Sequence, residues 1–365
     1  MYEYTGAIHI HSTFSDGTGT VEEIAKFANE VNLDFIILTD HNTLLARDEG
    51  MEKWFDNTMV IVGYEINDRS NKNHYLVMGL TELIGTFRVL FNGELGCNLS
   101  AEEYVTEIKK KGGIGFIAHP YEKRNQYPEH PAYPWTAWKS KDFDGIEIWN
   151  HMSEWVEGLN DNNKVQRFLH PLKSIEAPDK NAVKKWDELN KEKKVTAIGS
   201  VDAHAHKQNV MGFYTLEVFP YKVLFKSIRT HVLLDEEIEK GNGKKFDFYK
   251  KKIIEALRYG KSFIVNHYYG DGNGFRFFAE YDGATYNLGD EINFDRKKNK
   301  NIIFNAYIPK QAKMKLMKDG KCYDEYSGVG CVWDTKEPGN YRVECWLGEK
   351  AWIFSNHIRV KDKKK

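Results

Sequence analysis

The chain has 365 residues, of which 41% are hydrophobic and 29% are charged, a composition typical of folded globular proteins. This length exceeds what a single hydrophobic core usually supports, so we expect two domains. The formal net charge is −1. Binding to nucleic acid draws on a surplus of Lys and Arg, so this balance argues against nucleic acid as the main ligand.

The first residues, MYEYTGAIHIHS, lack the basic and apolar regions of a signal peptide, and no apolar run approaches the roughly 18 residues of a membrane span. We therefore expect no membrane association. The four cysteines are Cys97, Cys322, Cys331 and Cys345, with no CxxC pair. This pattern favours a reduced, cytoplasmic protein, in which the last three cysteines are small buried hydrophobic residues.

The first two-thirds of the sequence alternates between apolar runs of strand length and helical patterns. Thr20 and Glu23 form a capping box that predicts a helix from about Val21, and Ser100 predicts another helix over 101–111. Seven strands are expected at 6–11, 34–41, 59–66, 74–80, 113–119, 144–150 and 195–204. Strands that alternate with helices favour a parallel sheet, either open or closed into a barrel.

The pattern changes after about residue 265, where Gly260 follows the last predicted helix. Short β-type runs such as FRFFAEYDG and YRVECWLG then alternate with turn residues, and no helical pattern interrupts them. We therefore expect domains at 1–265 and 266–365, the second an antiparallel β-sandwich. The sequence of this sandwich shows no separate active site. Three roles stay open for it: it covers the first domain, it binds a partner, or it mediates self-association.

Histidines and carboxylates recur at the ends of the predicted strands. In His9-Ile10-His11 the two rings lie two residues apart on a strand, so they are expected to face the same side, and the same holds for Asp202-Ala203-His204. The full set is His9, His11, Asp16, Asp40, His41, Glu65, His74, His119, Asp202 and His204. Imidazole with carboxylate suits Mn, Fe or Zn, and the carboxyl ends of parallel barrel strands build active sites.

Each of these residues also has a structural alternative when taken alone. The His9–His11 pair is also consistent with a structural or surface role. Asp40 is consistent with a residue that caps a helix, and Glu65 with a residue at a sheet edge. His119 precedes Pro120 and is open to a turn, while His74 only begins its strand. Their recurrence at one end of several strands is what favours a cluster of two or three divalent metals.

The ordered motifs resemble those of the polymerase-and-histidinol-phosphatase (PHP) superfamily. They are His9-Ile10-His11-Ser12 with Ser15-Asp16-Gly17, then Thr39-Asp40-His41, Ala118-His119-Pro120 and Ser200-Val201-Asp202-Ala203-His204. The resemblance implies a distorted seven-stranded, TIM-like β/α barrel. It also implies three ligand sets: His9, His11, Glu65 and Asp202; Glu65, His74 and His119; and Asp16, His41 and His204. Asp16 stands where some members have His, and Asp40 is implied to orient a ligand.

The end of the chain, Trp352-Ile353-Phe354-Ser355-Asn356, is similar to the branch of this superfamily that includes carbaryl hydrolase. The segments 145–150 (GIEIWN) and 186–189 (WDEL) also fit that branch. Its members often have Pro after Ser-Asn, whereas this chain has His357, a departure that we expect to affect a turn and not the metal site.

These features predict a metal-dependent hydrolase of a small-molecule ester, most simply a phosphoesterase that uses a metal-bridging hydroxide. His206 is the candidate proton donor, and Lys123, Arg124 and Lys207 are candidate cations for a phosphate. Hydrolysis of carboxyl or carbamate esters at the same site is an alternative. Tyr121, Tyr127, Trp135 and Trp138 offer an apolar wall for such esters, and packing within their own loop stays open for these four residues. A PHP accessory module without turnover is the other alternative, although none of the expected ligand positions is missing.

Overall fold

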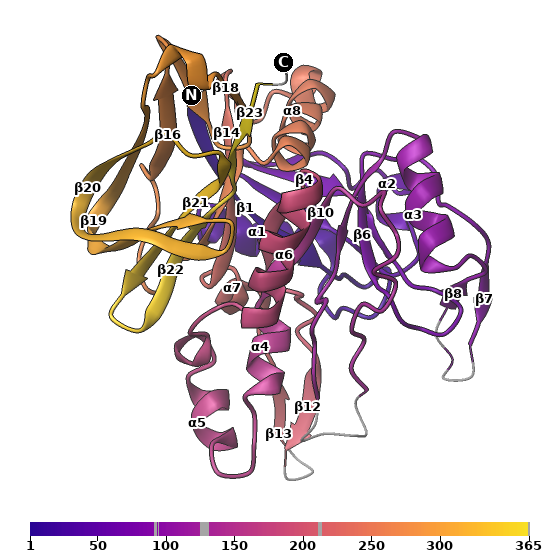
Figure 1. Cartoon of the computed structure of the whole chain (residues 1–365). Helices are drawn as coiled ribbons and strands as arrows, with labels where there is room; N and C mark the ends of the chain where they lie inside the picture. Colours follow the sequence, from indigo (N-terminus) through magenta and orange to yellow (C-terminus); the bar gives the residue numbers. More distant parts are fainter. Residues whose placement is uncertain (91–92, 94, 125–130, 211–213, 364–365) are drawn as a thin grey trace.

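The chain is a mixed α/β protein, and its computed structural model describes residues 1–90, 93, 95–124, 131–210 and 214–363. Among these residues, strands outnumber helices, and no helix is long and apolar enough to cross a membrane. Most strands belong to two sheets, one of which continues into the C-terminal β region, with helices packed around them (Figure 1).

The larger sheet begins with the N-terminal strands and ends with the C-terminal ones. Strands β1, β2 and β4 are parallel, whereas β14 and β15 run antiparallel and join β1 to the C-terminal strands through β22. Its N-terminal members and the joining strands are β1 (Tyr2–Ile10), β2 (Phe35–Leu38), β3 (Trp54–Phe55), β4 (Thr58–Val62), β14 (Ile228–Leu234) and β15 (Ser262–Asn266).

The second sheet has the order β11-β10-β9-β6-β5. Its strands are β5 (Tyr64–Ile66), β6 (Tyr75–Met78), β9 (Ile114–Ile117), β10 (Gly145–Asn150) and β11 (Thr196–Ser200). All seven predicted strand regions are therefore strands. The TIM-like barrel is not confirmed, because β6 runs antiparallel to both neighbours and the strands divide between two sheets.

Backbone hydrogen bonds nevertheless bring the two sheets together at both ends. The Val201 N–H donates to the Ile8 carbonyl at 3.1 Å, and the His11 N–H donates to the Ala203 carbonyl at 2.9 Å. At the other side β4 runs directly into β5, and Glu65 forms an isolated bridge with His41. The carboxyl ends of β1, β2 and β11 consequently lie around a common centre.

The helices begin where the sequence places their caps. Thr20 and Glu23 form the predicted capping box of α1, and Ser100 and Glu103 form that of α3. The last predicted helix ends at Gly260, whose φ of 69° fits a left-handed cap. The helices are α1 (Val21–Glu30), α2 (Leu45–Asp48), α3 (Ala101–Lys110), α4 (His151–Glu157), α5 (Lys164–Leu169), α6 (Lys180–Glu192), α7 (Tyr221–Leu224) and α8 (Phe246–Tyr259).

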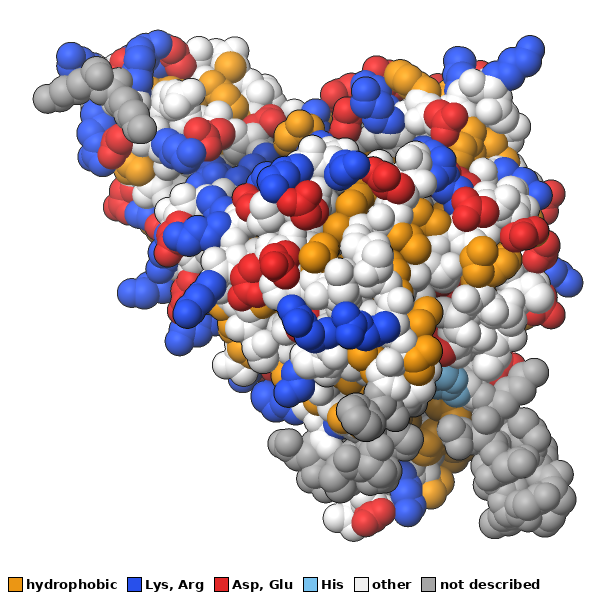
Figure 2. Space-filling model, turned by 90° about the vertical axis from the view of Figure 1, so that its right-hand side faces the viewer, with side chains coloured by type: hydrophobic (Ala, Val, Ile, Leu, Met, Phe, Trp, Pro, Cys, Tyr) orange, Lys and Arg blue, Asp and Glu red, His pale blue; other side chains and the backbone are white. Residues whose placement is uncertain are grey.

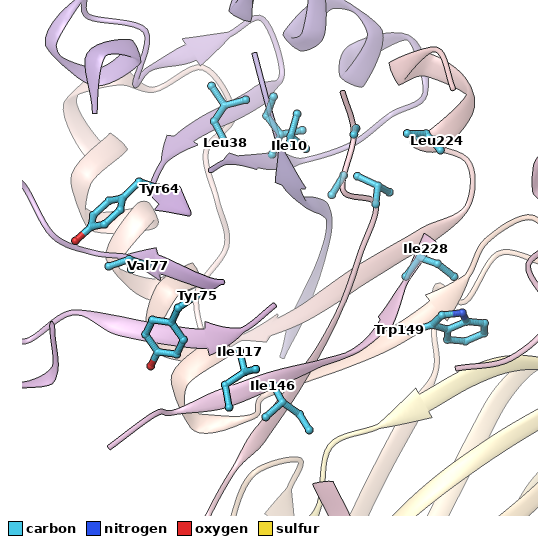
Figure 3. Close-up of a cluster of buried hydrophobic side chains, with 14 of the residues drawn as sticks. Ile10, Leu38, Tyr64, Tyr75, Val77, Ile117, Ile146, Trp149, Leu224 and Ile228 are labelled. Atoms are coloured by element: carbon cyan, nitrogen blue, oxygen red, sulfur yellow. The ribbon is translucent and has the colours of Figure 1, made fainter. Parts of the chain in front are cut away.

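A buried apolar core lies between the two sheets and the helices beside them. Ile10 and Leu38 from the larger sheet and Val77, Ile117 and Ile146 from the smaller one belong to a single cluster and are fully buried (Figure 3). Two short hairpins, β7 (Phe87–Val89) with β8 (Leu95–Cys97) and β12 (Lys207–Val210) with β13 (Tyr214–Glu217), were not predicted. The core fixes the strands whose ends carry the histidines.

The C-terminal region is all β apart from one short turn of helix at Arg296–Lys298, and it has its own hydrophobic core. The domain boundary predicted at 265 stays a prediction and falls inside β15. The strands are β16 (Arg276–Tyr281), β17 (Ala284–Asn287), β18 (Glu291–Phe294), β19 (Ile302–Lys318), β20 (Lys321–Thr335), β21 (Gly339–Leu347), β22 (Lys350–Ser355) and β23 (Ile358–Asp362).

The four cysteines are unpaired, as expected from the sequence. The expectation that Cys322, Cys331 and Cys345 are all buried was wrong for two of them: Cys345 is buried, Cys331 is half-buried and Cys322 is exposed. The difference follows from β20, whose side chains mostly face solvent along the outer part of the β19–β20 ribbon.

A buried ion-pair network joins α6 to the C-terminal sheet. Both Arg342 Nε and Nη2 donate to the Asp187 carboxylate at 2.8 Å, and His357 Nε2 lies 3.0 Å from the same carboxylate. Arg342 also donates to Glu344 at 2.7 Å. His357, which sequence comparison placed in a turn away from the metal site, is thus away from that site but serves as a buried partner of Asp187.

Replacing Arg342 with Met should lower the free energy of unfolding by about 3–5 kcal/mol, because Asp187 and Glu344 would keep their charges in a buried place without this partner. Urea unfolding followed by circular dichroism measures the change. The matched control is Lys361→Met, which removes a solvent-exposed pair with Glu291 and should change stability by less than about 1 kcal/mol. Equal effects of the two substitutions would contradict a structural role for the buried network.

Candidate metal centre

Nine residues predicted as metal ligands come together, most of them at or after the carboxyl ends of strands and His74 just before β6. His9 lies in β1, His41 follows β2, and Glu65 lies in β5. The others come from the loops that flank β1, β6, β9 and β11: His11, Asp16, His74, His119, Asp202 and His204. Although the nine residues are spread over almost 200 positions of the sequence, five of their histidines lie within 4 Å of the Glu65 carboxylate.

Glu65 is the centre of the cluster and is 1% exposed. Its two oxygens divide the histidines into two groups. Glu65 Oε2 lies 3.1 Å from His9 Nε2, 3.3 Å from His11 Nε2 and 3.5 Å from His41 Nδ1. Glu65 Oε1 lies 2.9 Å from His74 Nδ1 and 3.2 Å from His119 Nε2. A carboxylate with nitrogen donors beside both oxygens has the arrangement needed to bridge two cations.

Asp16 organises a second part of the cluster nearer to solvent. Its carboxylate lies 3.4 Å from His204 Nε2, 3.5 Å from His11 Nδ1 and 3.7 Å from His41 Nε2, and the side chain is half-exposed. The His11 and His204 rings stack with centroids 4.1 Å apart. This is the predicted third set with His11 added to it.

The groups of donor atoms close enough to share an ion differ in part from the sets implied by sequence. His11 joins Asp16, His41 and His204; His9 and His11 share a group with Asp202; and Glu65 is shared by the remaining two groups. Those two are His9 with Glu65 and His119, and His41 with Glu65 and His74. The resemblance put His119 and His74 in one set, whereas here each lies with Glu65 and a different third histidine.

The backbone is strained where three of these side chains leave their strands. His9, His119 and Asp202 have φ values of 66°, 28° and 52°. These values lie in the left-handed region, which residues other than Gly rarely adopt. A register shift interrupts the β1–β2 pairing between Ile8 and Ile10. Simple strand alternation is therefore not the reason that His9 and His11 converge; the irregularity at His9 turns both rings toward Glu65.

Asp40 lies beside the cluster and holds the loop that carries Asp16. Its carboxylate accepts hydrogen bonds from the Ser12 N–H at 2.7 Å, the Ser12 hydroxyl at 2.8 Å and the Ser15 hydroxyl at 2.6 Å. Gly17 is also required in this loop, because a Cβ there would lie 2.2 Å from the His11 carbonyl oxygen. Asp40 thus contacts the loop and not the donor atoms, as its implied orienting role requires.

Glu147 is a site residue that the sequence analysis did not single out. Its carboxylate lies 2.9 Å from His9 Nδ1 and accepts hydrogen bonds from the His119 N–H at 2.7 Å and from Asn150 Nδ2 at 2.8 Å. Asn150 also donates to Asp202 at 3.2 Å. The available signal was an acidic residue inside the apolar strand GIEIWN, which places a carboxylate in the interior.

Charge interactions within the cluster oppose the effect of burial. Burial disfavours the charged form of Glu65, yet the surrounding histidines hold the pKa of that carboxyl well below its usual range. Burial likewise disfavours protonated His11, but its interactions with Asp202 and Glu65 raise its pKa to about 10. The pKa of His119 rises to about 9, mainly through Glu65 against the opposing effect of burial. The raised pKa values of His11 and His119 favour protonated rings that offset part of the negative charge of the buried carboxylates, whereas burial lowers the pKa of His41 to about 3.

The donor set fits divalent cations by two further observations. Both ring nitrogens of His11 and Nε2 of His74 are buried and have no hydrogen-bond partner among the described residues. The carboxylates of Glu65, Asp202 and Glu147 are buried together, and negative charges in such a place need nearby cations. Imidazole nitrogens with carboxylate oxygens suit Mn, Fe or Zn.

A cavity of about 670 Å³ opens over this cluster. Arg124 and His206 line it, and the His206 ring stacks on that of His204 with centroids 5.0 Å apart. Lys123 does not line it; its ammonium lies 3.3 Å from Glu157 and 3.8 Å from Asp179 instead. The side chain of Lys207 lies outside the described part of the structure.

Three of the four residues predicted to form an apolar wall after His119 pack elsewhere, whereas Tyr133 of the same segment lines the cavity and stacks on His74. Trp135 is buried beside Tyr75, and Tyr121 packs against Trp138 with ring centroids 5.7 Å apart. These three residues do not line the cavity, and Tyr127 lies outside the described residues. The apolar side chains that do line it come mainly from α4 and the segments after α4 and β13.

Residues 7–130 match the PHP domain family. An uncharacterised protein of Methanocaldococcus jannaschii is 29% identical over 179 residues, which cover 45% of this chain and 91% of that protein. A Bacteroides vulgatus protein described as having two domains, with a predicted PHP-like metal-dependent phosphoesterase, is 15% identical; the match covers 98% of this chain and 95% of that one, with a TM-score of 0.44.

A lesion-specific endonuclease from Pyrococcus furiosus is 12% identical, with coverage of 70% of this chain and 56% of that one and a TM-score of 0.39. The prediction against nucleic acid as the main ligand rested on net charge and stays a prediction. The comparisons do not confirm the carbaryl-hydrolase-like branch. The segment that matches the PHP family model contains His9, His11, Asp16, His41, Glu65, His74 and His119.

Proposed function

We propose that this chain is a metal-dependent hydrolase of ester bonds, with phosphate esters as its substrates. The observation that carries the proposal is Glu65, a buried carboxylate with histidine nitrogens within 3.5 Å of each of its oxygens. When bound, two or three Mn, Fe or Zn ions would supply an activated water near neutral pH and would take up the negative charge that develops on the ester. The match of residues 7–130 to the PHP domain supports this reading.

The residues of the chain would divide the work. His9, His11 and Asp202 would hold one cation, and Glu65 would share its oxygens between neighbouring cations. Asp16 with His41 and His204 would hold the most exposed one. Glu147 and Asp40 would fix the orientation of these groups, because each binds a ligand or its loop directly. His206 would exchange a proton with the leaving group at the open side, and Arg124 would contact a phosphate oxygen.

A carboxyl or carbamate ester hydrolase is the second candidate function. Arg124 is the one Lys or Arg side chain that lines the cavity among the described residues, and both its Nε and Nη2 donate to Glu122. A phosphate dianion gains from cations beyond the metals, whereas a neutral ester does not. Part of the cation support expected for phosphate, namely Lys123, is therefore missing from the cavity.

Purified protein should contain more than one equivalent of Mn, Fe or Zn, and chelation should abolish ester hydrolysis. The reason is the set of six histidines around shared carboxylates, which favours these metals over Mg. Elemental analysis and a panel of phosphomonoesters, phosphodiesters and aryl carboxyl esters on one preparation measure both quantities. Metal content that stays below one equivalent after reconstitution, or turnover that survives chelation, would contradict the proposal. Faster turnover of the neutral esters would instead favour the second candidate.

Replacing Glu65 with Gln should reduce kcat far more than replacing Asp40 with Asn. The first substitution removes the charge at the centre of the cluster, whereas the second only loosens the loop at Ser12 and Ser15, an effect of about 10–100-fold. Steady-state kinetics with metal content and circular dichroism on each variant separate these effects. Equal losses in the two variants would mean that the assignment of Glu65 and Asp40 is wrong.

Metal binding should release protons, so the apparent affinity should rise with pH between about 6 and about 8. His11 and His119 have pKa values raised to about 10 and about 9 in the metal-free chain, and a protonated ring cannot bind a cation. Titration of Zn²⁺ in two buffers with different enthalpies of ionisation counts the released protons. An affinity that does not change over this pH range would contradict a role for these two rings as ligands.

A further inference from the structure

The cavity has two chemically different halves. One half is the cluster of histidines and carboxylates, and the other is a wall of apolar side chains. We call this second half the α4–α5 wall; it consists of Met152, Trp155, Val156, Leu159, Phe168 and Phe219. Hydrophobic side chains also lie next to the exposed histidine surface in Figure 2. In Figure 1, α4 and α5 project together with the β12–β13 hairpin from the end of the molecule below the sheets.

Contacts within the wall hold its shape. The Trp155 indole N–H donates to the Arg167 carbonyl at 3.2 Å, and Arg167 Nη1 donates back to the Trp155 carbonyl at 2.8 Å. The Trp155 ring makes edge-to-face contacts with Phe219 and Phe168, with centroids 4.5 Å and 4.9 Å apart. The wall is therefore a preformed surface at the cavity and not a set of loosely placed side chains.

The base of the hairpin ties the wall to the metal cluster. The Val218 N–H donates to the His206 carbonyl at 2.7 Å, and the His206 ring stacks on that of His204. Phe219 is 5% exposed and contacts both Trp155 and His151. A group that occupies the space over His204 would consequently face the wall across the same cavity.

We propose that the α4–α5 wall binds an aromatic or similarly bulky apolar group of the substrate while the ester lies over the histidine and carboxylate cluster. This inference rests on the proposed hydrolysis for the position of the ester, and it adds the class of alcohol that the ester carries. A cavity of about 670 Å³ is within the range of sites that enclose small organic molecules, roughly 300–1,000 Å³. Small alkyl esters would leave this apolar surface in contact with water, and bulky ones would cover it.

The pair of probes is phenylphosphonate and methylphosphonate, which share a headgroup and differ in the apolar group. Calorimetric titration of the full chain as purified, at one pH and salt concentration, gives both dissociation constants. Phenylphosphonate should bind at least about tenfold more tightly, since burial of one ring accounts for that much. Equal affinity for the two probes would overturn the proposal.

The test variant is Met152→Ala with Phe168→Ala, which removes two side chains from the wall. Leu169→Ala is the matched control, because Leu169 is on the same helix as Phe168, is 70% exposed and does not line the cavity. The preference for phenylphosphonate should fall about tenfold in the double variant and stay unchanged in the control. An unchanged preference in a double variant with normal circular dichroism would overturn the proposal.

If the double variant does not fold, Val156→Thr replaces a half-buried wall residue with a nearly isosteric polar one. It should reduce the preference severalfold, and no reduction would count against the wall. Because binding of the phosphonates is measured without turnover, the proposed wall and the proposed hydrolysis can each be contradicted without the other. A preference for phenylphosphonate in a chain that hydrolyses no ester would support the wall and contradict the hydrolase; ester turnover without that preference would do the reverse.

Discussion

Glu65 is buried among histidines, and the arrangement of the surrounding strands follows from the need to compensate its charge. An isolated carboxylate in this place would be strongly destabilising, so partners must approach it from several directions. They do so because the carboxyl ends of β1 and β2 and the start of β6 surround β5. The carboxylates raise the pKa values of His11 and His119 to about 10 and about 9, so protons on these two rings offset part of the negative charge. In the proposed hydrolase, bound cations would take the place of these protons.

Part of the strained backbone of the chain lies at this centre. His9, His119 and Asp202 all have positive φ. His9 and His119 contact Glu147, and Asp202 accepts a hydrogen bond from Asn150, which also donates to Glu147. Such conformations are unfavourable by about 1–3 kcal/mol each and persist only where the surroundings enforce them. Here the enforcing contacts are those of Glu147 with His9, His119 and Asn150 and the backbone bonds from Val201 and Ala203 to β1. The strained backbone conformations at His9, His119 and Asp202 therefore accompany the orientation of these candidate ligands toward the centre.

Local sequence pattern was sufficient for seven strand regions, for the two capping boxes and for most residues of the cluster. These depend on an apolar run of strand length, on a Ser or Thr with Glu three residues later, and on an acidic or histidine residue beside an apolar run. Local pattern was insufficient wherever the partner comes from a distant segment. Glu147 acquires its role through His9, and His357 through Asp187, contacts that no local pattern encodes. The antiparallel direction of β6 and the pairing of β15 with β22 were missed for the same reason.

The α4–α5 wall is formed by tertiary packing and not by the segment whose composition predicted it. Aromatic residues after His119 have the composition of a binding wall, but Trp135 and Trp138 are occupied by packing against Tyr75 and Tyr121. The segments α4 and α5 have ordinary amphipathic sequences, and they become a wall only because Trp155 is fixed by Arg167 and faces the cavity. In the proposed hydrolase, the reaction would depend on the strand ends, and the choice of substrate would depend on α4, α5 and Phe219, which contribute no candidate ligand.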